Sequence, residues 1–274
     1  MKIGKLILPG TALLAGLFMV SSVKGQDADP NKWAPVNIQI DGKANEWPKP
    51  LNFYNNDTKL FYTIANDSNN LYVVINVPDP VSQMKIMRAG VTFSVNPTGK
   101  KKVVSSVTFP LLGEDAPEVV ESQNQRTSVE WRRSVLQNAK QINVEGLIGV
   151  PDGNLPVKND KNIRCAASLD DQGNMVCELA IPLQYLGLTI SNDKPVAYRF
   201  KVNPLSRDDR KAKEKEQKDK QAAIVAAQKE GKTPPAEHHK EGEHGMYHGL
   251  NGPGMENLFY AKDFWTRQTM ATHR

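Results

Sequence analysis

LFYTIANDSNNLYVVINV, residues 60–77, is the stretch that decides the fold class. Residues 60–65 and 71–77 are rich in β-branched and aromatic side chains, and polar residues 66–70 separate them. β-branched and aromatic residues favour strands, whereas clusters of Asn, Asp and Ser favour turns. The stretch therefore predicts an antiparallel hairpin.

Short strand patterns recur on both sides of this hairpin. They lie at residues 36–40, 91–95, 103–111, 142–150, 164–167, 175–181 and 196–202. One short helix is expected at residues 128–138, because Val129, Arg132 and Val135 are spaced to share one face. Many short strands separated by turns are typical of an antiparallel sandwich or barrel, and not of alternating strands and helices. The expected fold class is all-β.

The first 25 residues have the order of a secretory signal peptide. Lys2 and Lys5 precede an apolar stretch of 15 residues, 6–20, and a small-residue exit ends at Gly25. A membrane span needs about 20 apolar residues, so this stretch is too short for an anchor. We expect cleavage near Gly25, a secreted protein in the periplasm or at the cell surface, and no transmembrane segment in the mature chain.

The charge balance argues against nucleic acid as a partner. The whole chain carries 35 Lys and Arg against 30 Asp and Glu. Lys2, Lys5 and Lys24 belong to the leader, which leaves 32 positive against 30 negative charges, a net charge of +2. A domain that binds nucleic acid typically has a much stronger basic excess.

A charged segment interrupts the strand pattern near its end. Of the 24 residues 207–230, 14 are charged, and residues 231–254 are rich in Gly, Pro and His. This composition favours a solvated helix or a disordered tether over a core element. Residues 263–270 then alternate like a closing strand. We therefore divide the chain into a signal peptide (1–25), a single β domain (26–206 and 255–274) and an insertion (207–254).

Four motifs in chain order resemble family 9 carbohydrate-binding modules and their DOMON-like relatives. The motifs are IDGKANEW (40–47), NLYVVI (70–75), AGVTFSVNP (89–97), and ELAIP (178–182) followed by Leu186-Gly187. The resemblance spans residues 36–203 and the last strand. It implies an antiparallel β-sandwich, in agreement with the strand pattern, and a domain that binds glycans.

The resemblance also brings calcium into consideration as a cofactor, because several family members hold it with loop carboxylates. In this chain Asn96 stands before Pro97, where relatives often place Asp. The residues after Gly42 likewise lack the usual acidic side chain. These departures argue against calcium, and no other cofactor is implied.

Tryptophan side chains are the candidate ligand contacts, because family members stack aromatic rings on sugars and an indole offers a large, flat apolar surface. The candidate ligand-binding residues are Trp33 in the leading segment, Trp131 near the helix start, and Trp47. For Trp47, which lies in a fold motif, packing in the core is the alternative. Trp265 lies on the alternating last strand, and we expect it in the core.

Cys165 and Cys177 are the two cysteines of the chain. A hairpin between the strands that carry them, paired so that 165 faces 177, places them close enough to bridge. An exported protein enters an oxidising compartment, where a disulfide persists. We therefore predict a disulfide, with two reduced thiols as the alternative if the register shifts by one residue.

The insertion carries weak candidates for a metal site. His238, His239, His244 and His248 fall within 11 residues, among several glutamates. Imidazole and carboxylate suit Zn, Cu or Ni, but the spacing matches no closed structural zinc pattern. A solvated low-complexity loop is the alternative.

Motifs of catalysis are sparse. Residues 82–85, SQMK, match the S-x-x-K pattern, but its partner motifs are missing. The chain has no G-x-S-x-G, no H-E-x-x-H and no glycine-rich phosphate loop. We expect a secreted, non-catalytic module that binds glycans at the cell envelope. The alternative is a structural or interaction module without a sugar ligand, whose protein partner contacts the charged insertion.

Overall fold

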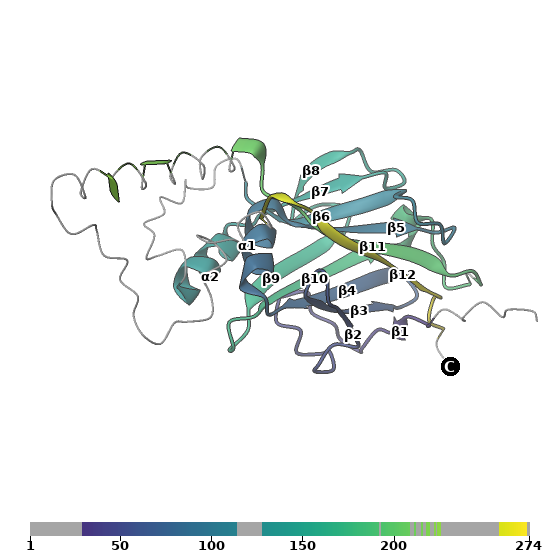
Figure 1. The fold of residues 1–274 in the computed structure, drawn as a ribbon. Coiled ribbons are helices and arrows are strands. Elements are labelled where there is room, and N and C mark those ends of the chain that lie inside the picture. The colour runs from purple at the N-terminus through teal and green to yellow at the C-terminus, as the bar shows by residue number, and fades with distance from the viewer. Residues whose placement is uncertain are drawn as a thin grey trace, which may run out of the picture.

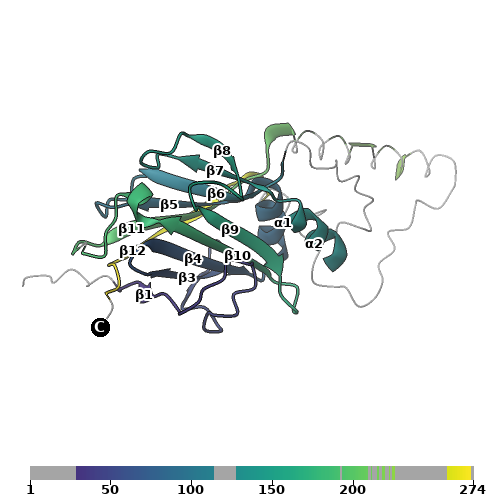
Figure 2. The same cartoon turned by 180° about the vertical axis from the view of Figure 1, so that it is seen from behind.

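The computed structural model describes residues 29–113, 128–191, 193–208 and 258–272, with single positions between 211 and 225. The signal peptide, the four candidate histidines and most of the insertion lie outside the described residues. Two six-stranded sheets are stacked face to face, as Figures 1 and 2 show from opposite sides. These two sheets confirm the prediction of an all-β sandwich.

The first sheet has the strand order β1-β3-β4-β10-β9, and β2 also pairs with β3. Its strands are β1 (Lys32–Trp33), β2 (Phe53–Asn55), β3 (Leu60–Asn66), β4 (Asn70–Val77), β9 (Arg164–Leu169) and β10 (Met175–Pro182). All pairs are antiparallel except the short contact of β1 with β3. The predicted hairpin at 60–77 is confirmed, because β3 and β4 pair with Ile64 opposite Val73.

The second sheet has the strand order β12-β11-β5-β6-β7-β8, and every pair in it is antiparallel. Its strands are β5 (Val91–Asn96), β6 (Ser105–Leu111), β7 (Gln141–Glu145), β8 (Gly153–Pro156), β11 (Val196–Val202) and β12 (Lys262–Gln268). The predicted closing strand therefore exists, and it adds to the edge of this sheet beside β11.

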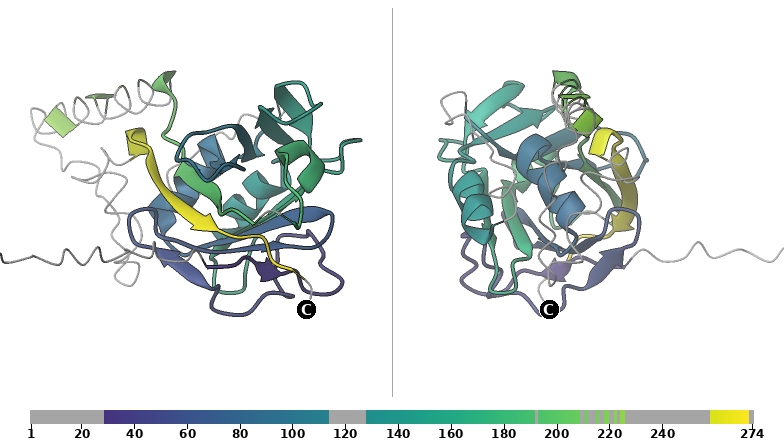
Figure 3. Two further views of the ribbon diagram at one scale, coloured as in Figure 1. Left: turned by 90° about the vertical axis from the view of Figure 1, so that its right-hand side faces the viewer. Right: turned by 60° about the vertical axis from the view of Figure 1, so that its left-hand side comes forward.

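The described residues of 29–206 contain two α-helices where one short helix was expected, and the described positions between 207 and 225 are helical as well. The expected helix is α2 (Val129–Gln137), and a second one, α1 (Pro80–Ala89), precedes β5. The side chain of Asp79 caps α1 by accepting a hydrogen bond from the Ser82 amide, and Gly90 ends the helix with a φ of 74°. The signal was present, since Asp79-Pro80 is a typical helix start. The two helices lie side by side at one end of the sandwich (Figures 1 and 3).

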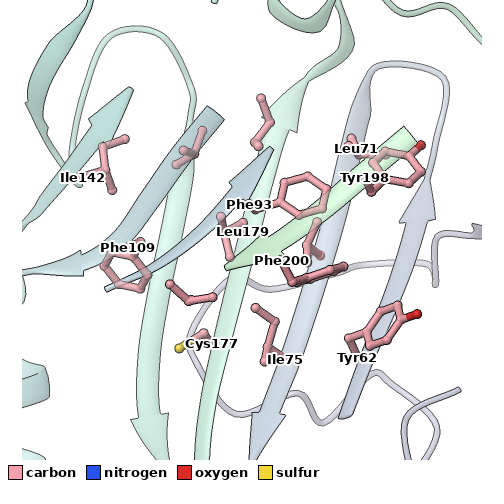
Figure 4. Close-up of a cluster of buried hydrophobic side chains, with 14 of the residues drawn as sticks. Tyr62, Leu71, Ile75, Phe93, Phe109, Ile142, Cys177, Leu179, Tyr198 and Phe200 are labelled. Carbon is pink, nitrogen blue, oxygen red and sulfur yellow. The ribbon is translucent and has the colours of Figure 1, made fainter. Parts of the chain in front are cut away.

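Alternate residues of the strands form the core between the sheets. Figure 4 shows aromatic and aliphatic side chains of both sheets pointing toward one another. The ring of Phe200 lies 4.7 Å from Tyr62 of the first sheet and 5.2 Å from Phe93 of the second, measured between centroids. Contacts of this kind between large buried rings account for much of the stability of a sandwich core.

A second apolar layer covers the outer face of the first sheet. Ala34, Ala44, Trp47 and Leu51, all buried, pack on outward-facing residues of β3, β4 and β10. The predicted strand at 36–40 is wrong, because these residues belong to this covering segment and not to either sheet. Asn37 takes a φ of 62°, which interrupts an extended chain, while Ile38 and Ile40 still pack on the layer. Alternation here reflects one-sided contact with a sheet face rather than strand pairing.

The predicted opposition of the two cysteines is also wrong. In the β9–β10 hairpin Cys177 faces Ala167, and Cys165 faces Leu179, so the two cysteines are diagonal neighbours. Both are free thiols. The register is offset because the turn runs from Asp170 to Asn174, where the Asp170 carboxylate accepts hydrogen bonds from the Gln172 and Asn174 amides. This Asx-type turn closes the hairpin one residue later than the expected pairing.

No helix among the described residues is long and apolar enough to cross a membrane. An η1 turn (Leu183–Leu186) follows β10 and ends at Gly187, which has a φ of 63°. This turn forms part of the wall of a cleft.

Candidate functional site

Two of the family-like motifs meet at one buried carboxylate. Glu178 on β10 is fully buried on the outer face of the first sheet. Its Oε2 accepts hydrogen bonds from the amides of Asp41 (3.1 Å) and Gly42 (2.7 Å), and its Oε1 accepts one from the Trp47 indole (2.9 Å). Burial raises the pKa of Glu178, while the three donors favour its charged form. The motif residues therefore fasten the covering segment to the sheet.

Gly42 is required at this junction for a steric reason. Its φ is 81°, and a Cβ atom there would lie 2.8 Å from the backbone of Ala167 and Ser168. The Ser168 hydroxyl also donates a 2.7 Å hydrogen bond to the Gly42 carbonyl. A residue with a side chain would push the segment off β9.

The three candidate tryptophans do not form one surface. Trp47 is 5% exposed, and its indole N–H is used by Glu178. Trp33 is half-buried on β1, at one edge of the first sheet. Trp131 is half-buried on α2, which packs on β9 at the opposite edge, and its ring contacts the core while its Nε1 is buried without a hydrogen-bond partner. The structure thus separates the three rings, and they do not form a common surface on which a sugar could stack.

Trp265 faces outward, and the expectation that it packs in the core is wrong. Its neighbour Phe264 takes the inward position, where it stacks on Phe200 at a centroid distance of 5.1 Å. Trp265 is half-buried on the opposite face of β12. The signal was present, because Trp265 is in phase with Asp263 and Arg267, which are charged and exposed. The sequence analysis placed Trp265 in the core and therefore missed it as a candidate ligand contact.

Arg199 lies over the Trp265 ring and pairs with Asp263. The guanidinium carbon of Arg199 lies 5.9 Å from the ring centroid, and Arg199 Nε donates a 2.8 Å hydrogen bond to Asp263. The Arg199 and Asp263 side chains are 26% and 33% exposed, so both reach solvent. The flat ring, the cation and the carboxylate are held together by cross-strand pairing, since Arg199 is directly opposite Trp265.

Polar side chains continue from this trio across the outer face of the second sheet. Pairing places Trp265, Arg199, Ser94, Ser106 and Glu145 in one row. The next row is Asp263, Lys201, Thr92, Thr108, Asn143 and Asn154. Members of the second row bond to one another: the Thr92 and Thr108 hydroxyls are 2.7 Å apart, and Asn143 donates to Asn154 at 3.0 Å. Ser94 and Ser106 in the first row are buried, whereas the second row is partly exposed. The second row therefore carries the accessible hydroxyl, amide and charged groups across the sheet.

A cleft of about 700 Å³ lies at the end of the first sheet. Three segments form its walls: the β3–β4 turn (68–70), residues 161–164, and residues 182–184 with 188–190 around η1. Its walls carry amides and hydroxyls, while Leu183 and Leu188 are buried. No residue of the outer-face trio lines it.

The described residues do not fit a calcium site at the positions suggested by the family. Asn96 is buried, and its Oδ1 accepts hydrogen bonds from the Thr98 amide and hydroxyl at 2.9 and 2.8 Å. Its Nδ2 donates to the Lys102 carbonyl at 2.7 Å, so the whole amide is used to close a turn. No group of three or more metal-binding side chains occurs within the described part of the chain, and the four histidines lie outside it.

The S-x-x-K residues are bound to the backbone of other segments. The Ser82 hydroxyl donates to the Thr58 carbonyl at 3.2 Å, and Lys85 Nζ donates to the Tyr260 carbonyl at 2.7 Å. Ser82 is 7% exposed and Lys85 2% exposed, so neither group is open to a large substrate. Lys85 links α1 to the segment that leads into β12.

Of the comparisons with known proteins, the one with solved structures found proteins similar to this chain. No family model matches the chain, and no curated protein matches it. A carbohydrate-binding module of family 9 from Caldicellulosiruptor kristjanssonii is similar in two structures, one in complex with cellotriose and one with glucose. The first has 14% identity and a TM-score of 0.32, and the second 13% and 0.31. Each match covers 67% of this chain, and 79% and 81% of the module.

Proposed function

We propose that this chain is a non-catalytic carbohydrate-binding module, and that it binds glycans on the outer face of its second sheet. The observation that carries the proposal is the trio of Trp265, Arg199 and Asp263. A pyranose has an apolar face of C–H groups and a rim of hydroxyls. The trio offers the matching parts side by side: a ring for the apolar face, a donor and an acceptor for the rim.

The electrostatics of the trio suit a neutral polyol. Arg199 uses Nε for Asp263, which leaves the other guanidinium N–H groups for hydroxyl oxygens. Asp263 Oδ2 accepts from Arg199, and its Oδ1 is available to accept from a hydroxyl. Because Asp263 and the ring both constrain Arg199, less side-chain entropy is lost when a ligand is bound.

The row from Asp263 to Asn154 extends the proposed surface beyond one sugar unit. Neighbouring strands lie about 4.8 Å apart, so the six strands of the sheet span about 24 Å. An extended glycan that begins at Trp265 on β12 runs across the hydroxyl and amide groups of β5, β6 and β7. Hydrogen bonds from such side chains add orientation and selectivity to the stacking on the ring.

Location and lack of catalysis are parts of the same proposal. The leader-like residues 1–25 support export, which brings a glycan-binding module to the periplasm or the cell surface. The single catalytic motif of the sequence has its hydroxyl and its amine bound to backbone carbonyls.

The test is affinity electrophoresis of the mature chain on neutral polysaccharides, followed by calorimetry with oligosaccharides of any that retard it. Trp265→Ala is expected to weaken binding by about 1–3 kcal/mol, the loss typical of an aromatic anchor. Tyr54→Ala is the matched control, because Tyr54 is an exposed aromatic residue on β2 of the other sheet. Equal losses in the two variants, or no retardation of the wild type by any polysaccharide, would contradict the proposal and favour an interaction module for a protein partner.

A further inference from the structure

We propose that the cleft beside η1 is a second ligand site, separate from the outer face, and that it takes a uronic acid, a sugar that carries a carboxylate. The inference does not rest on the outer-face site, because the two share no residue. It rests on the charge of the cleft, on the fixed position of its walls and on the chemistry of its lining.

The cleft is basic. Among the described residues that line it, Lys161 and Arg164 are the charged ones. The Arg164 backbone pairs with Ala180, and its side chain has no hydrogen bond or ion pair with another described residue. Lys161 pairs with Asp160 at 2.9 Å, but the Asp160 side chain is 82% exposed, and a pair this open contributes little. This wall therefore carries two positively charged side chains that are available to bind an anion.

Asp67, which precedes the 68–70 wall of the cleft, is engaged elsewhere. Asp67 Oδ1 accepts hydrogen bonds from the Asn69 and Asn70 amides, both at 2.7 Å, and its Oδ2 accepts one from the Tyr72 hydroxyl at 2.7 Å. Arg164 acts on Tyr72 through its charge across Ala180, which is paired with both residues. Asp67 thus orders the 67–70 turn and leaves the guanidinium of Arg164 to the cleft.

The walls are fixed before a ligand arrives. The Asn159 side chain donates to the Pro156 and Ile163 carbonyls and accepts from the Lys161 and Ile163 amides, at 2.9–3.3 Å. This network holds the loop that carries both cations. The opposite walls are joined by a 2.8 Å hydrogen bond from the Leu183 amide to the Asn69 carbonyl. A preformed site binds more tightly because little ordering is required on binding.

The lining matches a sugar better than a bare anion. The cleft of about 700 Å³ is within the usual range for small-ligand sites, roughly 300–1,000 Å³. The side-chain amides of Asn70, Asn162 and Gln184 can pair with ring hydroxyls. Ile190, which is 38% exposed, offers apolar surface for C–H groups. The two cations then favour a sugar that carries a carboxylate over the corresponding neutral sugar.

The test compares galacturonate with galactose, which lacks the carboxylate, by calorimetry on the full chain. We expect galacturonate to bind at least about tenfold more tightly than galactose, and its affinity to fall as salt is raised. Arg164→Gln should weaken galacturonate binding at least about tenfold, and Arg164→Lys should retain part of it, because the charge stays but the planar fork is lost. Arg133→Gln, at an exposed arginine on α2, is the matched control.

Three outcomes overturn the inference. Equal affinities for galactose and galacturonate remove the role of the carboxylate. Acetate or inorganic phosphate binding as tightly as galacturonate shows a general anion patch instead of a sugar site. An Arg164→Gln variant that binds like the wild type places the ligand elsewhere. Trp265→Ala should leave galacturonate binding unchanged, so that failure of this site and failure of the outer-face site are read separately.

Discussion

The carboxylate of Glu178 accepts a 2.9 Å hydrogen bond from the indole of Trp47, which lies 131 residues earlier in the chain. The bond joins the IDGKANEW motif to the ELAIP motif and holds a covering layer on the first sheet. Two of the four motifs that resemble the carbohydrate-binding family therefore have a structural role in this chain. Their presence supports the fold and assigns no ligand contact.

Glu178→Gln is expected to destabilise the protein by about 1–3 kcal/mol, because the new amide N–H₂ group faces buried donors that it cannot satisfy. Chemical denaturation measures the change in unfolding free energy. Glu145→Gln, at an exposed carboxylate on β7, is the control and should change the stability little. Equal stabilities of the wild type and Glu178→Gln would show that the covering layer is held without this carboxylate.

Trp131→Ala is expected to lower the melting temperature, because the ring packs against the core from α2. The loss should be about 1–3 kcal/mol, below the roughly 3–5 kcal/mol of a fully buried tryptophan. Trp265→Ala should lower the unfolding free energy by less than Trp131→Ala, because the Trp265 ring lies on the outer face of the second sheet. Thermal unfolding of the two variants in one buffer checks the order, and a larger loss for Trp265→Ala would contradict it.

The two cysteines are expected to be free and unreactive in the native protein. Burial raises the pKa of both thiols, so very little thiolate forms near neutral pH. Titration of unreduced protein should give two thiols per chain after denaturation, and a far slower reaction before it. A count of zero in the denatured, unreduced sample would show that the β9–β10 pairing shifts to admit a disulfide.

Lys85 is expected to make stability depend on pH in the alkaline range. Burial, and next the nearby Lys262, lower the pKa of Lys85 from its ordinary value of 10.5 to about 8. Between these values the unfolded chain binds more protons than the folded one, so this residue makes the unfolding free energy rise with pH. Below about pH 8 the amine is charged in both states, and the cost of burying the charge is fully present.

The Lys85 effect is measured as a difference, because buried tyrosines and thiols with raised pKa values act in the opposite direction. The stability of the wild type relative to Lys85→Met should increase from pH 8 to pH 10.5. Lys100→Met, at an exposed lysine, is the control and should show a flat difference. A flat difference for Lys85→Met as well would mean that the amine reaches water in the folded state.

Local sequence pattern was sufficient to predict most of the strands and one of the helices. The hairpin of β3 and β4, helix α2 and the closing strand β12 were all predicted, because apolar periodicity and turn residues act within a few positions. Helix α1 was missed although Asp79, Pro80 and Gly90 carry its cap signals. Residues 36–40 were mistaken for a strand, because a segment that lies flat on a sheet buries alternate residues in the same way.

Only the tertiary structure decided which side chains lie next to one another. Whether an alternating strand turns Trp265 or Phe264 inward depends on which face meets the other sheet, and the pairing of β12 with β11 settles it. The register that places the two cysteines diagonally depends on a side chain of the turn. The cleft depends on three segments that lie far apart in the chain. Sequence pattern determined which residues form strands, because propensity and periodicity are local. It did not determine the sites, because Arg199 and Trp265, or Arg164 and Gln184, are brought together by the register and layering of whole sheets.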